Sequence, residues 1–145
     1  MGEVRVRTKL TNALDEELHR QGHLSSDRVR TYEADAAVDT GAVRTILPVH
    51  VVQQLGLTIR GQRVAEYADG RQDVVDVTGP FVIAINDRDT LEEALVLGDE
   101  VLVGQTALEK MDLVVDCTNR RVMPNPAHPD QPVSKVKVIK QKRVR

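Results

Sequence analysis

The feature that most limits how this chain can fold is a repeated short alternation of apolar and polar residues. EVRVRTKL (residues 3–10) alternates in this way, and so do the two arms of QRVAEYADGRQDVVDV (residues 62–77). A period of two puts the apolar side chains on one face of a β-strand. The apolar members of these runs are mostly valine, which favours strands. The pattern therefore predicts half-buried strands joined by tight turns.

Short strands are predicted along most of the chain. Asp69-Gly70 stands between the two arms of residues 62–77 and is a strong hairpin signal. Two more strands are expected at residues 80–85 and 92–98, joined through NDRDTL (residues 86–91). The remaining predicted strands are residues 29–39, 101–104, 113–116 and 120–126. Since no strand–helix–strand rhythm is present, the sequence predicts a small, mostly antiparallel β domain.

Three short helices are expected among these strands, at residues 13–21, 48–57 and 105–112. Asn12 is suited to cap the first helix and Gly22 to end it, while Pro48 suits the start of the second. The first helix is expected as an insertion, at about residues 12–23, in the hairpin of the first two strands. A chain of 145 residues suits one hydrophobic core. We therefore expect a single domain over residues 1–132 and a separate tail over 133–145.

The tail differs from the rest of the chain in charge. SKVKVIKQKRVR (residues 134–145) carries six Lys or Arg and no acid, which leaves 14 basic against 22 acidic residues elsewhere. A basic segment can bind nucleic acid or an acidic surface. The more ordinary interpretation is a solvated or strand-forming end, because Val136 and Val138 alternate with Lys135 and Lys137. We favour the second interpretation and keep nucleic-acid binding as an alternative.

Cysteine content and hydropathy bear on the compartment. Cys117 is the one cysteine, so it cannot form an internal disulfide, and this fits a reducing compartment. MGEVRVRTKL lacks the apolar core of a signal peptide, and no apolar run approaches the length of a membrane span. The sequence therefore predicts a cytoplasmic protein with no membrane partner.

One aspartate stands where an alternating run stops. EADAAVDTGAVRTILP (residues 33–48) breaks at Asp39, turns through Thr40-Gly41 and resumes as an apolar stretch. A carboxylate at the mouth of a buried strand is costly unless something there uses its charge. The tripeptide alone also fits a structural turn, in which Asp bonds the nearby backbone and Gly relaxes the geometry. The Asp69-Gly70 hairpin, about thirty residues later, and the run VLVG before a helix favour a functional role.

This ordered set resembles the retroviral-type aspartic proteases (retropepsins), particularly their small single-domain bacterial relatives. The resemblance extends from Val29 to Asp116. It implies a small closed β domain with short helices that forms one lobe of a two-fold dimer. Two departures are present: Gln105 and Thr106 follow Gly104 in place of the family's usual charged residue, and the hairpin tip carries one glycine.

The resemblance also implies roles for individual residues. Asp39 would be the catalytic carboxylate, in an active-site loop with Thr40, Gly41 and Ala42. Thr40 would link the two loops of the dimer by hydrogen bonds. The hairpin tip would be a flap over the substrate, and a structural segment would pass behind the loop. The expected flap residues are Tyr67, Ala68, Asp69 and Gly70, and the expected structural segment is Val101, Leu102, Val103 and Gly104.

The chemistry of such a site needs two carboxylates that share one proton. The ionised carboxylate takes a proton from the attacking water, and the protonated one donates to the carbonyl oxygen of the peptide. The chain contains one Asp-Thr-Gly and no Asp-Ser-Gly. The second carboxylate is therefore expected from a second copy across a two-fold axis. This predicts a homodimeric aspartic endopeptidase that acts on peptide or protein substrates without a metal or other cofactor.

Several alternatives stay open at this stage. The same fold could serve as a non-catalytic dimeric module that binds peptides or protein partners. Tyr67 could be an ordinary strand residue, and Asp69 could be present for turn geometry alone. The four histidines are scattered without the spacing of zinc ligands, and nothing marks Cys117 as a nucleophile. The histidines are His19, His23, His50 and His128.

Overall fold

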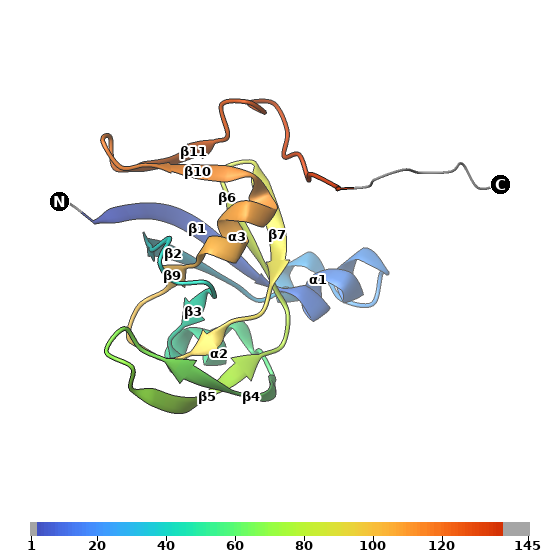
Figure 1. Cartoon of the computed structure of the whole chain (residues 1–145). Helices are drawn as coiled ribbons and strands as arrows, with labels where there is room; N and C mark the ends of the chain where they lie inside the picture. The colour runs from blue at the N-terminus through green and yellow to red at the C-terminus, as the bar shows by residue number, and fades with distance from the viewer. Residues whose placement is uncertain (1–2, 138–145) are drawn as a thin grey trace.

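The computed structural model describes residues 3–137. A nine-stranded sheet runs in the order β4-β5-β8-β3-β9-β2-β1-β6-β7, and β10-β11 form a second, two-stranded sheet (Figure 1). The predicted mostly β fold with short helices is confirmed. The strands are β1 (Val4–Asn12), β2 (Thr31–Val38), β3 (Ile46–Leu47), β4 (Ile59–Glu66), β5 (Gln72–Thr78), β6 (Phe81–Ile85), β7 (Arg88–Glu92), β8 (Leu95–Val96), β9 (Leu102–Val103), β10 (Leu113–Asp116) and β11 (Arg121–Pro124). The helices are α1 (Ala13–Arg20), α2 (Val49–Leu55), α3 (Gln105–Met111) and the 3-10 turn Ser26–Arg28.

Helix α1 lies between two strands that pair with each other. β1 and β2 are antiparallel, with Val4 opposite Val38. Asn12 Oδ1 accepts the N–H of Asp15 at 3.0 Å, which is the expected cap of α1. The buried carboxylate of Asp15 accepts the backbone N–H and the guanidinium of Arg30 at 2.8–3.0 Å. The hydrogen bonds from Arg30 lower the pKa of Asp15. They also join residue 30, just before β2, to helix α1.

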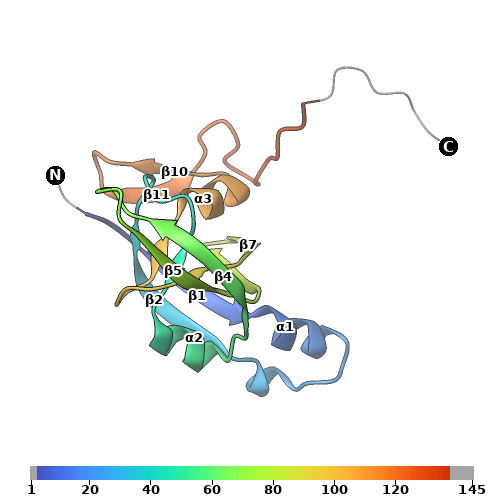
Figure 2. The same ribbon diagram turned by 60° about the horizontal axis from the view of Figure 1, so that its bottom comes forward.

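The β4–β5 hairpin forms where the Asp69-Gly70 signal predicts it. Val64 lies opposite Val74 in an antiparallel register, and the chain reverses between Tyr67 and Arg71. Figure 2 looks onto this hairpin, drawn in green. β4 is one edge of the nine-stranded sheet, and β7 is the other. The hairpin therefore joins the rest of the sheet through β5 only.

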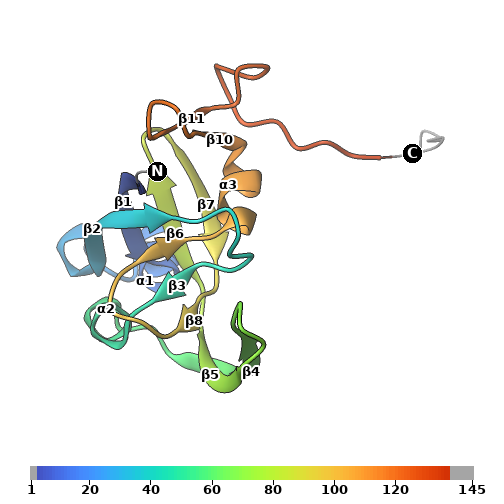
Figure 3. The ribbon, with the colours of Figure 1, turned by 60° about the vertical axis from the view of Figure 1, so that its left-hand side comes forward.

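The predicted strand at residues 92–98 and its connection at 86–91 are wrong. β7 begins at Arg88, directly after a two-residue turn in which Asn86 has a left-handed φ of 57°. Asn adopts this conformation more readily than most residues, which permits the tight reversal. After β7 the chain no longer pairs with β6. Leu95–Val96 forms a separate strand, β8, between β5 and β3 (Figure 3). Most of the predicted connection is therefore strand β7, and of the predicted strand at 92–98 only Glu92 and Leu95–Val96 lie in strands, in different parts of the sheet.

The core is almost entirely aliphatic. Helices α2 and α3 each bury apolar residues against the sheet: Val51, Val52 and Leu55 from α2, and Ala107, Leu108 and Met111 from α3. Phe81 is the one phenylalanine and is fully buried. The other large fully buried side chains include Leu10, Leu47, Ile83 and Ile85.

None of the helices within residues 3–137 is long and apolar enough to cross a membrane.

The junction between β9 and α3 packs directly on another part of the backbone. A Cβ atom at Gly104 would lie 2.5 Å from the carbonyl carbon of Arg44, 2.6 Å from its oxygen and 2.8 Å from the amide nitrogen of Thr45. Real Cβ atoms essentially never approach other atoms this closely. Because the neighbouring atoms belong to the backbone, no side chain can rotate away to make room. Only glycine fits at this position without moving the chain.

The segment after β11 is fastened to the end of α3 by Asp112. Its carboxylate accepts bonds from Asn125 Nδ2 at 3.0 Å, His128 Nδ1 at 2.7 Å and the backbone N–H of Val133 at 3.0 Å. The hydrogen bond from Asn125, followed by that from Val133, lowers the pKa of Asp112 to about 2. Buried Arg88 adds bonds to the carbonyl oxygens of Asp112 and His128. Residues 125–133 therefore pack as part of the domain.

The predicted tail at residues 133–145 falls partly outside this description. Residues 133–137 form no helix or strand, and residues 138–145 lie outside the described residues. Val136 is exposed in the described part. The role of the tail stays a prediction.

We expect Asp112→Asn to lower the melting temperature in a pH-dependent way. The pKa of Asp112 in the folded chain, about 2, lies below the ordinary aspartate value of about 3.9. The ionised carboxylate therefore stabilises the fold above about pH 4, and this contribution is lost as the pH falls toward 2. Melting curves from pH 6 to pH 2 should show the gap between wild type and variant narrowing at the acid end. Asp130→Asn, an exposed carboxyl in the same segment, is the control; a gap that does not change with pH would contradict the assignment.

We expect Gly104→Ala to destabilise the domain by about 1–3 kcal/mol, the usual cost of forcing an extra carbon into a packed site. Urea unfolding followed by circular dichroism measures this difference. Gly61→Ala is the matched control, because nothing lies within 4 Å of a Cβ at Gly61. Equal losses of stability in the two variants would show that the contact with Arg44 and Thr45 is not the cause.

Candidate active site

Asp39 begins the loop that follows β2. β2 pairs in parallel with β9, with Val38 opposite Val103. The backbone N–H of Asp39 continues this pairing by donating to Val103 O at 3.2 Å. The preceding residues of β2, Ala36 and Ala37, are buried, whereas Asp39 is exposed. The end of a buried strand therefore presents this carboxylate at the surface.

The loop itself holds the carboxylate. The N–H of Gly41 donates to Asp39 Oδ1 at 2.8 Å, and the N–H of Ala42 donates to Asp39 O at 3.1 Å. A Cβ at Gly41 would lie 3.1 Å from Asp39 Oδ1, so a side chain there would crowd the carboxylate. Thr40 and Gly41 are exposed, and Ala42 is half-buried. Glycine thus lets the loop turn back onto the aspartate, and its amide orients the acid group.

The predicted structural segment lies beside this loop. The N–H of Ala37 donates to Val101 O at 3.0 Å, and Leu102 and Val103 form β9. Beyond Gly104, the loop provides acceptors for the start of α3. Gln105 N–H donates to Ala42 O at 2.7 Å and Thr106 N–H to Val43 O at 3.1 Å, while Gly104 N–H donates to Thr45 Oγ1 at 3.2 Å. The first N–H groups of a helix have no partners within the helix, and here loop residues 42–45 satisfy three of them.

The hairpin tip has a compact structure of its own. Tyr67 N–H donates to Arg71 O at 2.8 Å, and Gly70, with a φ of 85°, donates back to Tyr67 O at 2.9 Å. Asp69 Oδ1 accepts the N–H of Arg71 at 3.0 Å, which is the turn role considered for it. Ala68 is exposed. No hydrogen bond joins this tip to residues 39–42 in the part of the chain that the structure describes.

The tyrosine at this tip lies under a cation. The guanidinium carbon of Arg71 is 4.7 Å from the centroid of the Tyr67 ring. Partial burial, followed by a hydrogen bond with Asp73, raises the pKa of Tyr67. Tyr67 therefore stays protonated and able to donate a hydrogen bond throughout the neutral range.

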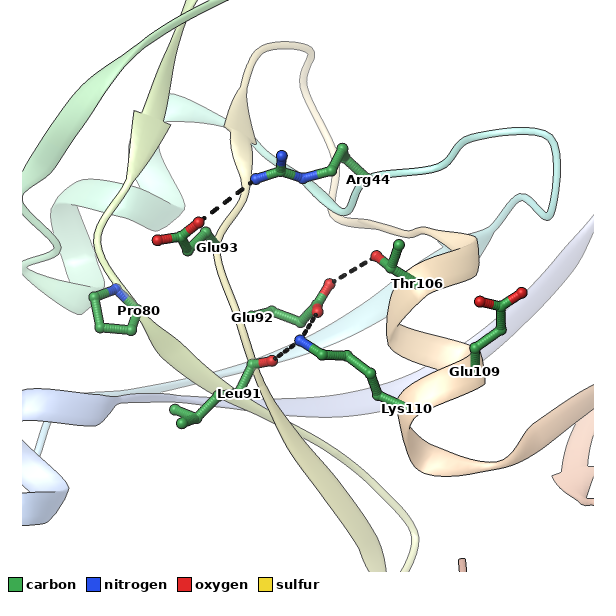
Figure 4. A pocket seen from close by; sticks show the side chains of 8 residues that line it. All are labelled: Arg44, Pro80, Leu91, Glu92, Glu93, Thr106, Glu109 and Lys110. Carbon is green, nitrogen blue, oxygen red and sulfur yellow. Dashed lines mark hydrogen bonds and ion pairs between the residues drawn. The ribbon is translucent and has the colours of Figure 1, made fainter. Parts of the chain in front are cut away.

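A groove of about 570 Å³ is lined by Arg44, which follows the loop that starts at Asp39 (Figure 4). Asp39 does not line it. Within it, buried Glu92 contacts Thr106 and Lys110, and Glu93 forms ion pairs with Arg44 and, at 3.4 Å, with Arg60. Its lining residues are Arg44, Pro80, Leu91, Glu92, Glu93, Thr106, Glu109 and Lys110.

Reasoning from the sequence missed Glu92 and Thr45, which are buried at 5% and 0% exposure. No local signal marks Glu92, because RDTLE (residues 88–92) does not alternate apolar and polar residues and falls mostly in the expected connection at 86–91. Among residues 3–137, no group of three or more His, Cys, Asp or Glu side chains is placed to hold a metal ion. Cys117 is exposed in the turn between β10 and β11.

Comparison with known proteins relates the chain to others by fold. No protein-family model matches the sequence, and no curated protein matches it. The solved structures that resemble it include the retroviral protease-like domain of Ddi1 from Leishmania major, with a TM-score of 0.53 and 12% identity over 91% of this chain and 90% of that one. A retropepsin-like aspartic protease from Rickettsia conorii has a TM-score of 0.49 and 16% identity over 79% of this chain and 77% of that one. The first likeness extends over nearly the whole chain, and the chain therefore has the retropepsin-like fold.

Proposed function

We propose that this protein is an aspartic endopeptidase in which two copies of Asp39 activate one water. The observation that supports this most strongly is the loop of Asp39: an exposed carboxylate at the end of a buried strand, oriented by the amide of Gly41 at 2.8 Å. The retropepsin-like fold gives this loop the setting that the sequence resemblance implies. The bond from Gly41 by itself is that of an ordinary turn, like the bond from Arg71 to Asp69, so the proposal rests on this loop together with the fold.

The proposed reaction uses acid–base chemistry alone. Two carboxylates about 3 Å apart cannot both ionise, so the pair contains one base and one acid. The base takes a proton from water as the water oxygen attacks the peptide carbonyl, and the acid donates its proton to the carbonyl oxygen. A proton then reaches the leaving amine as the C–N bond breaks. These steps need no metal or other cofactor.

The exposed surface around the loop supports a homodimer. Each chain supplies one Asp39, so a complete pair requires a second copy. Val43, four residues further on, is 65% exposed, and a second copy or a substrate that covered it would remove this apolar side chain from water. Thr40 is also exposed and free to form the loop-to-loop hydrogen bonds that the resemblance implies.

The substrate in this proposal is an extended peptide. It would lie as a strand between the loop of Asp39 and the hairpin tip at residues 67–70, with main-chain hydrogen bonds giving much of the affinity. At the tip, Ala68 is exposed and available to it, whereas half-buried Tyr67 already bonds Asp73. The cytoplasmic location stays a prediction.

Asp39→Asn should abolish cleavage while leaving the fold intact, because asparagine has nearly the same shape but cannot exchange a proton. Mass spectrometry of a mixed peptide library measures cleavage, and Asp130→Asn is the control. When wild type and Asp39→Asn are mixed equally and allowed to exchange subunits, about a quarter of the dimers carry two aspartates. Activity per total protein should then fall below half. Retention of a full half would contradict a shared site, and an inactive wild type that still binds peptides would support the non-catalytic module.

Val43→Glu should weaken the dimer, since it brings two added charges together near the two-fold axis. We expect sedimentation to show more monomer than for wild type at the same concentration, and specific activity to fall more steeply on dilution. Val49→Glu, at a 56% exposed position on α2, is the matched control. If Val43→Glu dimerises like wild type, this part of the surface does not form the interface.

A further inference from the structure

Glu92 is a buried carboxylate at the end of β7 that the proposed reaction does not use. Its side chain is 4% exposed. Figure 4 shows the acid group between α3 and the segment that contains Arg44, facing Thr106 and Lys110. A buried charge is costly unless it is paired and hydrogen-bonded. Its partners therefore indicate what it does.

Both oxygens of Glu92 are occupied. Oε1 accepts the hydroxyl of Thr45 at 3.2 Å and that of Thr106 at 3.3 Å, and Oε2 accepts Lys110 Nζ at 2.7 Å. Lys110 also donates to the carbonyl oxygen of Leu91 at 2.6 Å. The lysine thus holds the carboxylate in place from one side, which leaves Oε1 as the acceptor for the two threonines.

The two threonine hydroxyls connect Glu92 to the loop of Asp39. Thr45 has one hydroxyl proton, and when this is directed to Glu92 the oxygen presents a lone pair to the N–H of Gly104. The hydroxyl of Thr106 lies 2.9 Å from Val43 O, so its single proton is shared between that carbonyl and Glu92. Glu92 therefore sets the direction of the Thr45 hydroxyl, whereas the Thr106 hydroxyl has its shorter bond to Val43 O.

We propose that Glu92, held by Lys110, is a positioning residue for the active-site loop. It directs the hydroxyl proton of Thr45 toward itself, so that the hydroxyl oxygen stays open to the N–H of Gly104 and the loop stays bonded to the start of α3. The loop then holds Asp39 at the separation from its counterpart that the shared proton requires. The effect on catalysis rests on the proposed function, whereas the ordering of the loop does not.

Replacing the carboxylate by an amide should disturb this arrangement without changing its shape. In Glu92→Gln one of the two acceptor oxygens becomes an NH₂ group, so either the threonines or Lys110 lose their acceptor. We expect the amides of Gly104 and Thr106 to exchange with solvent at least about tenfold faster than in wild type, because their partners are no longer fixed. Since a displacement of about 1 Å can cost about 100-fold in rate, kcat should fall roughly 10- to 100-fold with little change in KM.

The experiment compares matched variants by hydrogen exchange and by peptide cleavage. Glu109→Gln is the first control: Glu109 lines the same groove but is exposed, and its side chain accepts Gln105 Nε2 at 3.1 Å. Thr45→Val removes the hydroxyl with little change in shape, and Thr45→Ser retains it, so this pair tests the same network if Glu92→Gln fails to fold. Faster exchange and lower kcat in Glu92→Gln and Thr45→Val, but not in Glu109→Gln or Thr45→Ser, is the expected result.

Two other results would contradict the proposal. One is exchange at Gly104 and Thr106 that stays at the wild-type rate in Glu92→Gln and Thr45→Val. The other is equally faster exchange in Glu109→Gln, which would indicate a general loosening of the groove. A wild type that cleaves no peptide contradicts the proposed function instead, and the exchange rates alone then decide whether Glu92 orders the loop.

Discussion

The contact between the loop of Asp39 and the start of α3 is the constraint on which the rest of this site depends. Gly104 lets the two backbones meet at a distance that no side chain would permit. The loop carbonyls of Ala42 and Val43 then accept the first N–H groups of the helix. The first N–H groups of a helix need hydrogen-bond acceptors from outside the helix, so a loop that supplies these acceptors is held in place by them. The position of Asp39 is therefore tied to the core through Ala107, Leu108 and Met111.

Buried polar side chains repeat this principle elsewhere in the domain. Asn12 caps α1 and also donates to the carbonyl oxygen of Leu55 at 2.8 Å, at the end of α2. Arg88 ties the end of α3 to the segment after β11. Within residues 3–137, no buried side-chain nitrogen or oxygen lacks a hydrogen-bond partner. Apolar contacts in an aliphatic core are not directional, whereas hydrogen bonds are. The bonds of these buried polar side chains therefore fix how the helices and strands around the core are aligned.

The parts of the site differ in how firmly they are held. The loop is bonded on both sides, to β9 and to α3. The β4–β5 hairpin joins the sheet only through the short β5–β8 pairing, and most of β4 is exposed. A hairpin with few contacts can move with little loss of stability, whereas the loop cannot. In the proposed function, the loop would be the fixed side of the peptide site and the hairpin its movable side.

The sequence by itself determined the features that depend on near neighbours. Asn12 as a helix cap, the reversal at Asp69-Gly70 and the turn at Asp39 follow from local backbone rules, and alternation located most strands. Only the tertiary structure decided that residues 88–92 and 95–96 belong to different parts of the sheet, and that β2 pairs in parallel with β9. The same holds for the meeting of Thr45 with Glu92, 47 residues apart. Such contacts depend on how the sheet curls and packs as a whole, and no local pattern of residue types specifies that.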